Sequence, residues 1–248
     1  MKLIVYTALF ADDSIPLEQV GRFYPFVHDK KDVQYIAFTN RKDLVSDFWD
    51  VRYTPLDKNI SPRMNSRFHK WNPANVLEDF THSIWMDSQC YFVNEPTAIV
   101  NHYLGKDYHT AIHRHTDLTS VYVEGLVSSY VYKTDLPSLI NGQLEKYFDA
   151  GLPYNYDHYE TGILIRKNNS ESNMLSSKVY NELLEHSIRD QISTPFVVWQ
   201  LREEGDKGIL SIQESFTGHK GQLPLPKSQI FFTEPKPSEM LKENLQVR

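Results

Sequence analysis

Residues 81–92 read Thr81-His-Ser-Ile-Trp-Met-Asp87-Ser-Gln-Cys-Tyr-Phe92, an aromatic and aliphatic run with one carboxylate near its middle. The run predicts a buried strand, in which an unpaired charge is strongly unfavourable. Strands of open α/β sheets present their ligand-binding groups at the carboxyl end, where an aspartate can hold a metal ion or a ribose. We therefore predict that Asp87 anchors a metal in a ligand site. The alternative is a carboxylate that caps a turn or pairs with a buried arginine.

Composition limits the classes of protein to which the chain can belong. Its 248 residues suit one large α/β domain, and a net charge of −6 lacks the basic excess of most polyanion-binding proteins. The one cysteine, Cys90, has apolar neighbours and predicts a core residue in a reducing compartment. No stretch reaches the roughly 18 apolar residues of a membrane span, and the start lacks a signal peptide. These features predict a cytoplasmic protein with no membrane span.

The order of the predicted elements indicates an α/β fold. β-branched and aromatic runs at 2–10, 33–39 and 49–56 predict strands, and helical spacing at 17–27 predicts a helix after the first of them. Further strands are predicted at 108–116, 158–166 and 209–215, and helices at 63–80, 96–104, 118–150, 170–187 and 192–202. No linker divides the chain, so we predict a single domain over residues 1–248 with a Pro-rich tail from about residue 223.

Arg63, Arg67 and Lys70 recur at helical spacing and so share one face of the predicted helix at 63–80. A stripe of three cations is most often a solvated face. It can also clamp a diphosphate, because arginine matches phosphate oxygens with two parallel hydrogen bonds and lysine adds a point charge. Both interpretations remain open at the level of the sequence.

Several segments occur in a fixed order along the chain: Tyr6-Thr-Ala-Leu-Phe10, Tyr35-Ile-Ala-Phe-Thr39, Arg67-Phe-His-Lys70, Ser83-Ile-Trp-Met-Asp87, Tyr122-Val-Glu124, Glu160-Thr-Gly162 and Arg189-Asp-Gln-Ile-Ser193. Together they resemble the GT-A-type glycosyltransferases related to plant mucilage and turgor-regulation proteins. The resemblance covers most of the chain. It implies a Rossmann-like GT-A fold with a mixed central sheet flanked by helices. It also implies a nucleotide-sugar donor and a divalent cation, Mn²⁺ or Mg²⁺.

The resemblance also assigns roles to residues. Asp87 would hold the metal together with His219, although the usual Asp-x-Asp is here reduced to one carboxylate followed by Ser88 and Gln89. Asp190 is the first choice for the catalytic carboxylate, and Glu124 and Glu160 follow. The nucleotide sugar would be bound by the remaining residues of the set, namely Tyr6, Thr7, Asp12, Arg63, Arg67, Lys70, Asp87, Gln89, Gly162, Gln191 and Lys220.

The acceptor would be the hydroxyl of a glycan or of a small molecule, and three rival functions remain. One is a transferase of the kind that phages use on a modified DNA base, which predicts a continuous basic groove. A second is a non-catalytic sugar-binding protein, in which Asp87 is structural. A third is a metal-dependent hydrolase built on the histidines at 109, 113 and 115, of which His113 and His115 share one strand face at a spacing seen in zinc sites. The histidines can equally form the polar lining of an acceptor groove.

Overall fold

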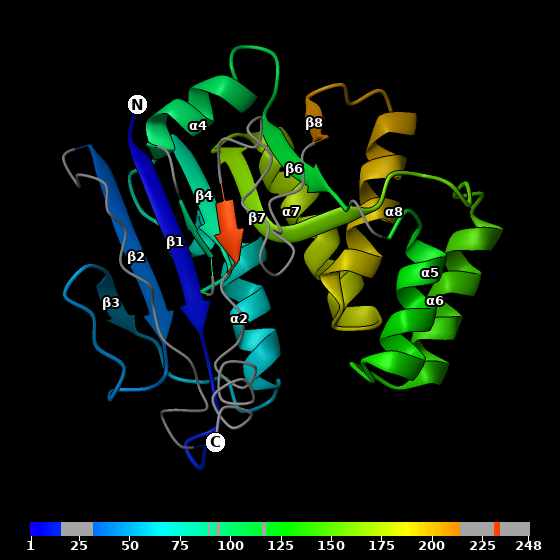
Figure 1. Cartoon of the computed structure of the whole chain (residues 1–248), viewed down its shortest axis with the longest axis horizontal. Helices are drawn as coiled ribbons and strands as arrows, with labels where there is room; N and C mark the ends of the chain where they lie inside the picture. Colours follow the sequence, from blue (N-terminus) through cyan, green and yellow to red (C-terminus); the bar gives the residue numbers. More distant parts are fainter. Residues whose placement is uncertain (16–31, 89, 93–94, 116–117, 214–230, 234–248) are drawn as a thin grey trace, which may run out of the picture.

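The computed structural model of the chain describes residues 1–15, 32–88, 90–92, 95–115, 118–213 and 231–233. Within these ranges seven strands form one mixed sheet in the order β3-β2-β1-β4-β7-β6-β8, and two short strands, β5 and β9, form a second sheet (Figure 1). The strands are β1 (Leu3–Leu9), β2 (Val33–Thr39), β3 (Asp50–Tyr53), β4 (His82–Met86), β5 (Cys90–Phe92), β6 (Thr110–Arg114), β7 (Tyr159–Lys167), β8 (Ile209–Ile212) and β9 (Phe231–Thr233).

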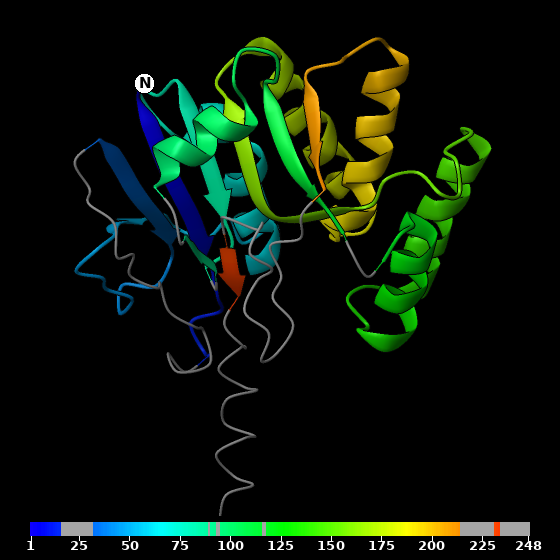
Figure 2. The same cartoon turned by 45° about the horizontal axis from the view of Figure 1, so that its top comes forward.

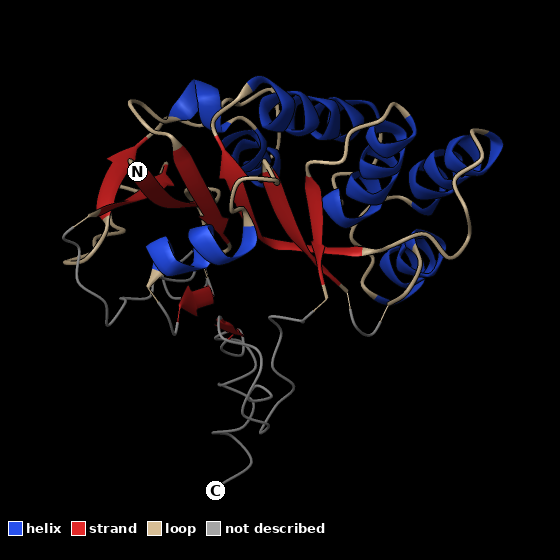
Figure 3. Cartoon of the chain, turned by 90° about the horizontal axis from the view of Figure 1, so that it is seen from above, coloured by secondary structure: helices blue, strands red, loops and turns tan. Residues whose placement is uncertain are grey.

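Helices cover both faces of the large sheet (Figure 3). They are α2 (Pro62–Trp71), α3 (Pro73–Val76), α4 (Pro96–Tyr103), α5 (Val121–Leu126), the π-helix η1 (Val127–Val131), α6 (Pro137–Asp149), α7 (Ser170–Glu185) and α8 (Asp190–Glu203). The predicted α/β fold, a mixed central sheet flanked by helices, is confirmed. The helix predicted at 17–27 lies outside the described residues. No described helix is both long enough and apolar enough to cross a bilayer.

The direction of the strands decides where a ligand can bind. β3, β2, β1 and β4 run parallel, so their carboxyl ends meet at one edge of the sheet. β7 runs antiparallel between β4 and β6, and its Ile163 pairs with Met86 at the end of β4. The start of β7 therefore reaches the same edge of the sheet, and the residues just beyond Met86 and just before Ile163 are neighbours.

The stretch at 81–92 is not one strand, and this part of the prediction is wrong. β4 ends at Met86, and the amide of Cys90 donates to the carbonyl of Asp87 (2.9 Å) in a tight turn. The chain then leaves the large sheet, because residues 90–92 pair with β9. Asp87 thus follows the buried strand instead of interrupting it, and its charge lies where water and ligands can reach the edge of the sheet.

Two apolar layers hold the sheet between its helices. On one face α2, α7 and α8 bury Trp71, Leu175 and Val198 against β1, β4 and β7. On the other face α4 packs Ile99 and Val100 onto the same strands. The helices α5 and α6 stand beside α8 at one end of the molecule and have a small core of their own with it (Figures 1 and 2). α8 is thus the element that joins the sheet to the helical end.

Candidate functional site

Asp87 lies directly after β4, at the carboxyl edge of the parallel strands. Its amide donates to the carbonyl of Gly162 (2.8 Å), which extends the β4–β7 ladder by one hydrogen bond. Its Oδ1 accepts from the indole Nε1 of Trp85 (2.9 Å), and the side chain is 34% exposed. No described group bonds to Oδ2 of this carboxylate. Within the described residues Asp87 is therefore fixed through one oxygen and has the other without a partner.

The cationic face of α2 turns toward the sheet edge and not toward solvent. Lys70 is 1% exposed, and its Nζ lies 2.5 Å from Oδ2 of Asp190 and 3.8 Å from Oδ1 of Asp87. Arg67 is 13% exposed and contacts Oδ1 of Asp190 at 3.1 Å. The interpretation of the stripe as a solvated face is wrong for both residues, because α2 packs this face under the start of α8.

Asp190 is the first residue of α8 and is 1% exposed. Besides the two cations, it accepts a hydrogen bond from the indole of Trp71 (3.3 Å). Burial raises the pKa of Asp190, but Arg67 and Lys70 outweigh this effect and hold the pKa well below its usual range. The carboxylate is thus ionised at neutral pH and shared between two cations of α2.

Arg63 completes the stripe and has unused donors. It is partly buried, and no hydrogen bond or ion pair joins it to the described residues. Burial lowers the pKa of Arg63, and the charges of Arg67 and Arg189 lower it further. The Nε of Arg67 is buried without a hydrogen-bond partner in the described residues. The three cations of α2 thus lie near two carboxylates, Asp87 and Asp190, and the excess of one positive charge suits an anion.

Glu124 and Glu160 are both buried, with different neighbours. Glu124 is 0% exposed, and its Oε1 accepts from Nε of Arg189 (2.6 Å) and from Oγ of Ser128 (2.9 Å). Burial raises the pKa of Glu124, but His158 and Arg189 outweigh this effect and lower it to about 2. Glu160 is 2% exposed on β7, opposite His113 across a β-bulge. Of the three predicted carboxylates, only Asp190 contacts the cations of α2.

Tyr6 and Thr7 are 0% exposed on β1, so their side chains do not line a surface. The hydroxyl of Tyr6 donates to the carbonyl of Lys70 (3.2 Å) and accepts from the buried guanidinium of Arg166. Burial raises the pKa of Tyr6 to about 12, despite the nearby Arg166. Tyr6 thus supports α2 from below. The sequence contained no signal for this contact, because the partners are 64 residues apart.

The other predicted ligand residues differ in how exposed their side chains are. Asp12 is exposed in the loop after β1, where its Oδ1 accepts from the amide and hydroxyl of Ser14. Gln191 is half-buried in the first turn of α8. Gln89, His219 and Lys220 lie outside the described residues.

Two clefts open at the carboxyl ends of β2 and β3, the edge at which Asp87 lies. One has a volume of about 450 Å³ and is lined by Thr39, Arg41, Lys42, Trp49 and Tyr53. The other has about 500 Å³ and lies beside α2, with Phe38, Phe68, His69 and Tyr180 in its wall. Either volume is in the range of small-molecule sites.

The histidines do not gather into a metal site in the described part of the chain. His109 contacts Asp206 (3.0 Å), and His113 is buried beside the ring of Tyr103. His115 lies beyond the strand and stacks on His158, with 5.3 Å between ring centroids. The predicted shared face of His113 and His115 is wrong, because β6 ends at Arg114 and the alternation of the strand does not extend to His115.

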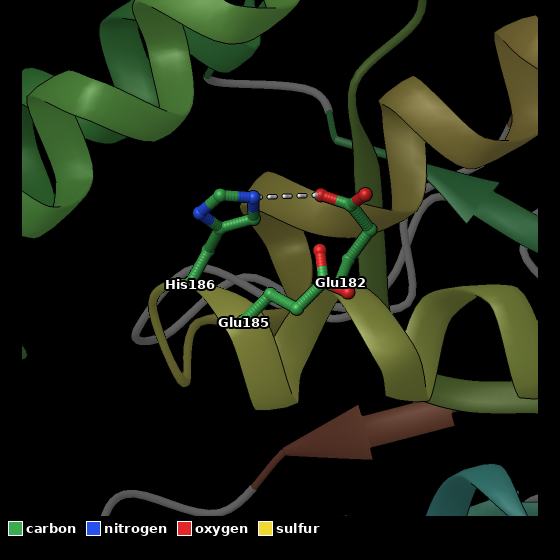
Figure 4. A group of neighbouring side chains, drawn as sticks. All are labelled: Glu182, Glu185 and His186. Atoms are coloured by element: carbon green, nitrogen blue, oxygen red, sulfur yellow. Dashed lines mark ion pairs between the residues drawn. The ribbon is translucent and has the colours of Figure 1, made fainter.

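Three ligand atoms do approach one another at the end of α7, in Glu182, Glu185 and His186 (Figure 4). Lys146 already occupies this group, since its Nζ lies 2.7 Å from Oε1 of Glu182 and 3.0 Å from Nε2 of His186. Tyr147 donates to the other oxygen of Glu182 (2.8 Å). The spacing of these three residues on one helix is visible in the sequence. In the structure, however, the ammonium group of Lys146 takes the position that a metal ion would need.

Comparison with known proteins gives two matches. The model of the family described as "TOD1/MUCI70, glycosyltransferase-like domain" matches residues 47–215. A protein of Arabidopsis thaliana named "Alkaline ceramidase TOD1" is 24% identical over 220 residues, which are 79% of this chain and 48% of the relative. The chain thus spans about half the length of that relative.

Proposed function

Because the chain belongs to the TOD1/MUCI70 glycosyltransferase-like family, we propose that it transfers a sugar from a nucleotide-sugar donor to an acceptor hydroxyl. The observation that supports the proposal is the cation group Arg63, Arg67 and Lys70 near Asp190, beside the partly exposed Asp87. When the glycosidic bond to the donor breaks, the diphosphate leaves with the bonding electron pair. Cations held in place before the reaction stabilise this developing charge without reorganisation.

In this proposal Arg63 and Arg67 bind the diphosphate through N–H groups that have no partner among the described residues. Lys70 is buried and contributes its charge from behind them. Asp190 keeps these side chains from repelling one another and orients Lys70 toward Asp87. The role of Asp190 or Glu160 as a carboxylate that contacts the acceptor stays a prediction.

The carboxylate of Asp87 is a suitable ligand for a divalent cation. Oδ2 of Asp87 has no partner among the described residues, and the side chain is 34% exposed. Hard oxygen ligands of this kind are those that Mg²⁺ and Mn²⁺ prefer. Such a cation, held by Asp87 and by His219 as predicted, would supply Lewis-acid charge to the leaving diphosphate. Lys70 contributes a fixed positive charge 3.8 Å from Oδ1 of Asp87.

The name of the Arabidopsis relative refers to ceramide hydrolysis, which we do not transfer to a chain that matches half of it. One line of groups resembles a hydrolytic relay: Asp206 contacts His109, which contacts the hydroxyl of Thr110. Thr110 is 0% exposed, however, and its hydroxyl donates to Ser172. A substrate carbonyl has no access to this hydroxyl, so these three groups give no support to a hydrolytic function.

A thermal-unfolding series tests the proposal. We expect at least one nucleoside diphosphate with Mn²⁺ to stabilise the protein by about 2.7 kcal/mol at a hundredfold excess over its Kd. Asp87→Asn should keep the fold and lose the part of the shift that depends on Mn²⁺. Asp50→Asn, at an exposed carboxylate paired with Arg52, is the matched control. The proposal is wrong if no nucleoside diphosphate or nucleotide sugar shifts the unfolding of wild type in either metal condition.

A further inference from the structure

We propose that Glu124 is a positioning residue that acts through Arg189: it fixes the start of α8, and thereby the Asp190 carboxylate between Lys70 and Arg67. The inference goes beyond the proposed function, and rests on it where affinity for a nucleotide is concerned. Its geometric part concerns the described residues alone.

Glu124 is closed to any substrate. Its side chain is 0% exposed, and Oε1 is used by two donors, Nε of Arg189 at 2.6 Å and Oγ of Ser128 at 2.9 Å. Oε2 faces the ring of His158, whose Nε2 lies 3.8 Å away and which is also 0% exposed. A carboxylate sealed in this way cannot take a proton from an acceptor hydroxyl, so its effect must pass through a neighbour.

Arg189 is that neighbour, and it stands at the start of α8. It is the N-cap residue, directly before Asp190, and it makes no side-chain capping hydrogen bond. Its own amide donates to Oγ of Ser187 (3.1 Å), and its carbonyl accepts from Ile192 in the first turn of the helix (2.9 Å). The ion pair with Glu124 therefore supplies the restraint that a capping side chain usually gives.

The neighbouring residues Arg189 and Asp190 are thus each held by an ion pair with a different part of the protein. Glu124, on α5 at the helical end, holds Arg189, whereas Lys70 and Arg67, on α2 beside the sheet, hold Asp190. Arg189 and Asp190 are joined by one peptide bond, with about 3.8 Å between their Cα atoms, so a displacement of the Arg189 backbone is expected to displace Asp190 as well. The position of Asp190 relative to α2 therefore depends on the contact that Glu124 makes.

The indole of Trp71 reports on this position, because its Nε1 donates to Oδ2 of Asp190 (3.3 Å). The chain has four tryptophans, so a ¹H–¹⁵N spectrum of the labelled protein contains four indole signals that Trp→Phe variants can assign. Trp49, in the core on the other face of the sheet, is an internal reference. A purely structural role of Glu124 would lower stability and leave the Trp71 signal in place.

The experiment compares Glu124→Gln and Arg189→Lys with wild type. The lysine keeps the charge but lacks the Nε–H that donates to Glu124. We expect both variants to shift the Trp71 signal and not the Trp49 signal. We also expect a 10- to 100-fold weaker Kd for the nucleoside diphosphate that stabilises wild type best, about the loss seen when groups behind metal ligands are replaced. Asp206→Asn, which changes a carboxylate in contact with His109 at the other end of α8, is the control and should leave the Trp71 signal unchanged.

Each outcome decides the proposal. An unmoved Trp71 signal in folded Glu124→Gln and Arg189→Lys overturns it, whatever the nucleotide data show. If wild type binds no nucleoside diphosphate, the proposed function fails and the Trp71 signal alone decides the positioning role. If Glu124→Gln does not fold, Ser128→Ala, which removes only the second donor to Oε1, takes its place with the same expected direction of shift.

Discussion

Replacing Asp190 by asparagine should destabilise the fold strongly, which a solvent-facing catalytic carboxylate would not do. Asparagine keeps the shape and the hydrogen bond from Trp71 but removes the charge that Lys70 and Arg67 share. Lys70 is 1% exposed, and of its two carboxylate partners among the described residues it would keep Asp87, at 3.8 Å. Leaving one partner of a buried ion pair unpaired costs about 3–5 kcal/mol. Since total stabilities are about 5–15 kcal/mol, this loss is a large fraction of the free energy of unfolding.

The double variant Asp190→Asn/Lys70→Met identifies the cause. Removing both charges leaves no buried lysine to neutralise, so stability should return to within about 1–2 kcal/mol of wild type. The assay is urea unfolding at pH 7 followed by circular dichroism, with equal slopes m required for a comparison. Asp50→Asn is again the control, because its pair with Arg52 is exposed and is worth less than about 1 kcal/mol. A loss below about 1 kcal/mol in Asp190→Asn, or a double variant no better than the single one, would refute the charge-balance reasoning.

Two further predictions concern neighbouring groups. Arg63→Met should leave the free energy of unfolding within about 0.5 kcal/mol of wild type, because the donors of Arg63 have no partner among the described residues. The same change should weaken nucleoside diphosphate binding about tenfold in calorimetry. Unchanged binding would exclude Arg63 as a phosphate ligand. Glu124 has a folded pKa of about 2, below its ordinary 4.5, so it contributes stability above pH 4.5 that is lost as the pH falls. Between pH 6 and pH 3 wild type should therefore lose about 2 kcal/mol more than Glu124→Gln in urea unfolding, and parallel pH profiles would contradict the shifted pKa.

Local patterns were enough to predict most elements of the fold. The strand at 33–39 matches β2 to the residue, because charge before it and Asn40-Arg41-Lys42 after it mark both ends. The helix at 192–202 begins two residues earlier, at Asp190, because the ion pairs of Arg189 and Asp190 hold the first turn. A spacing rule sees only neighbours along the chain, so it could not detect a helix start fixed by residues of α2 and α5.

The same limit applies to the site. Helical spacing predicts that Arg63, Arg67 and Lys70 share one face of a helix, but it does not predict which residues contact that face. The answer depends on Asp190, which is 120 residues beyond Lys70 in the chain. The motif that contains Arg189 predicts no role for it, because its partner Glu124 is 65 residues away in the chain. Which carboxylates are sealed and which reach solvent is a property of tertiary packing.

The position of β7 also affects the synthesis of the protein. β4 pairs with β1 on one side, but its other neighbour, β7, ends 81 residues later, from Met86 to Lys167. At about 5–20 residues per second, a ribosome needs roughly 4–16 s for that interval. During this time the four parallel strands can assemble, and the apolar β4 is their open edge, a surface on which other chains can pair. The nascent chain is therefore most prone to aggregate after β4 emerges and before β7 does, and a chaperone that covers this edge should raise the yield of folded protein.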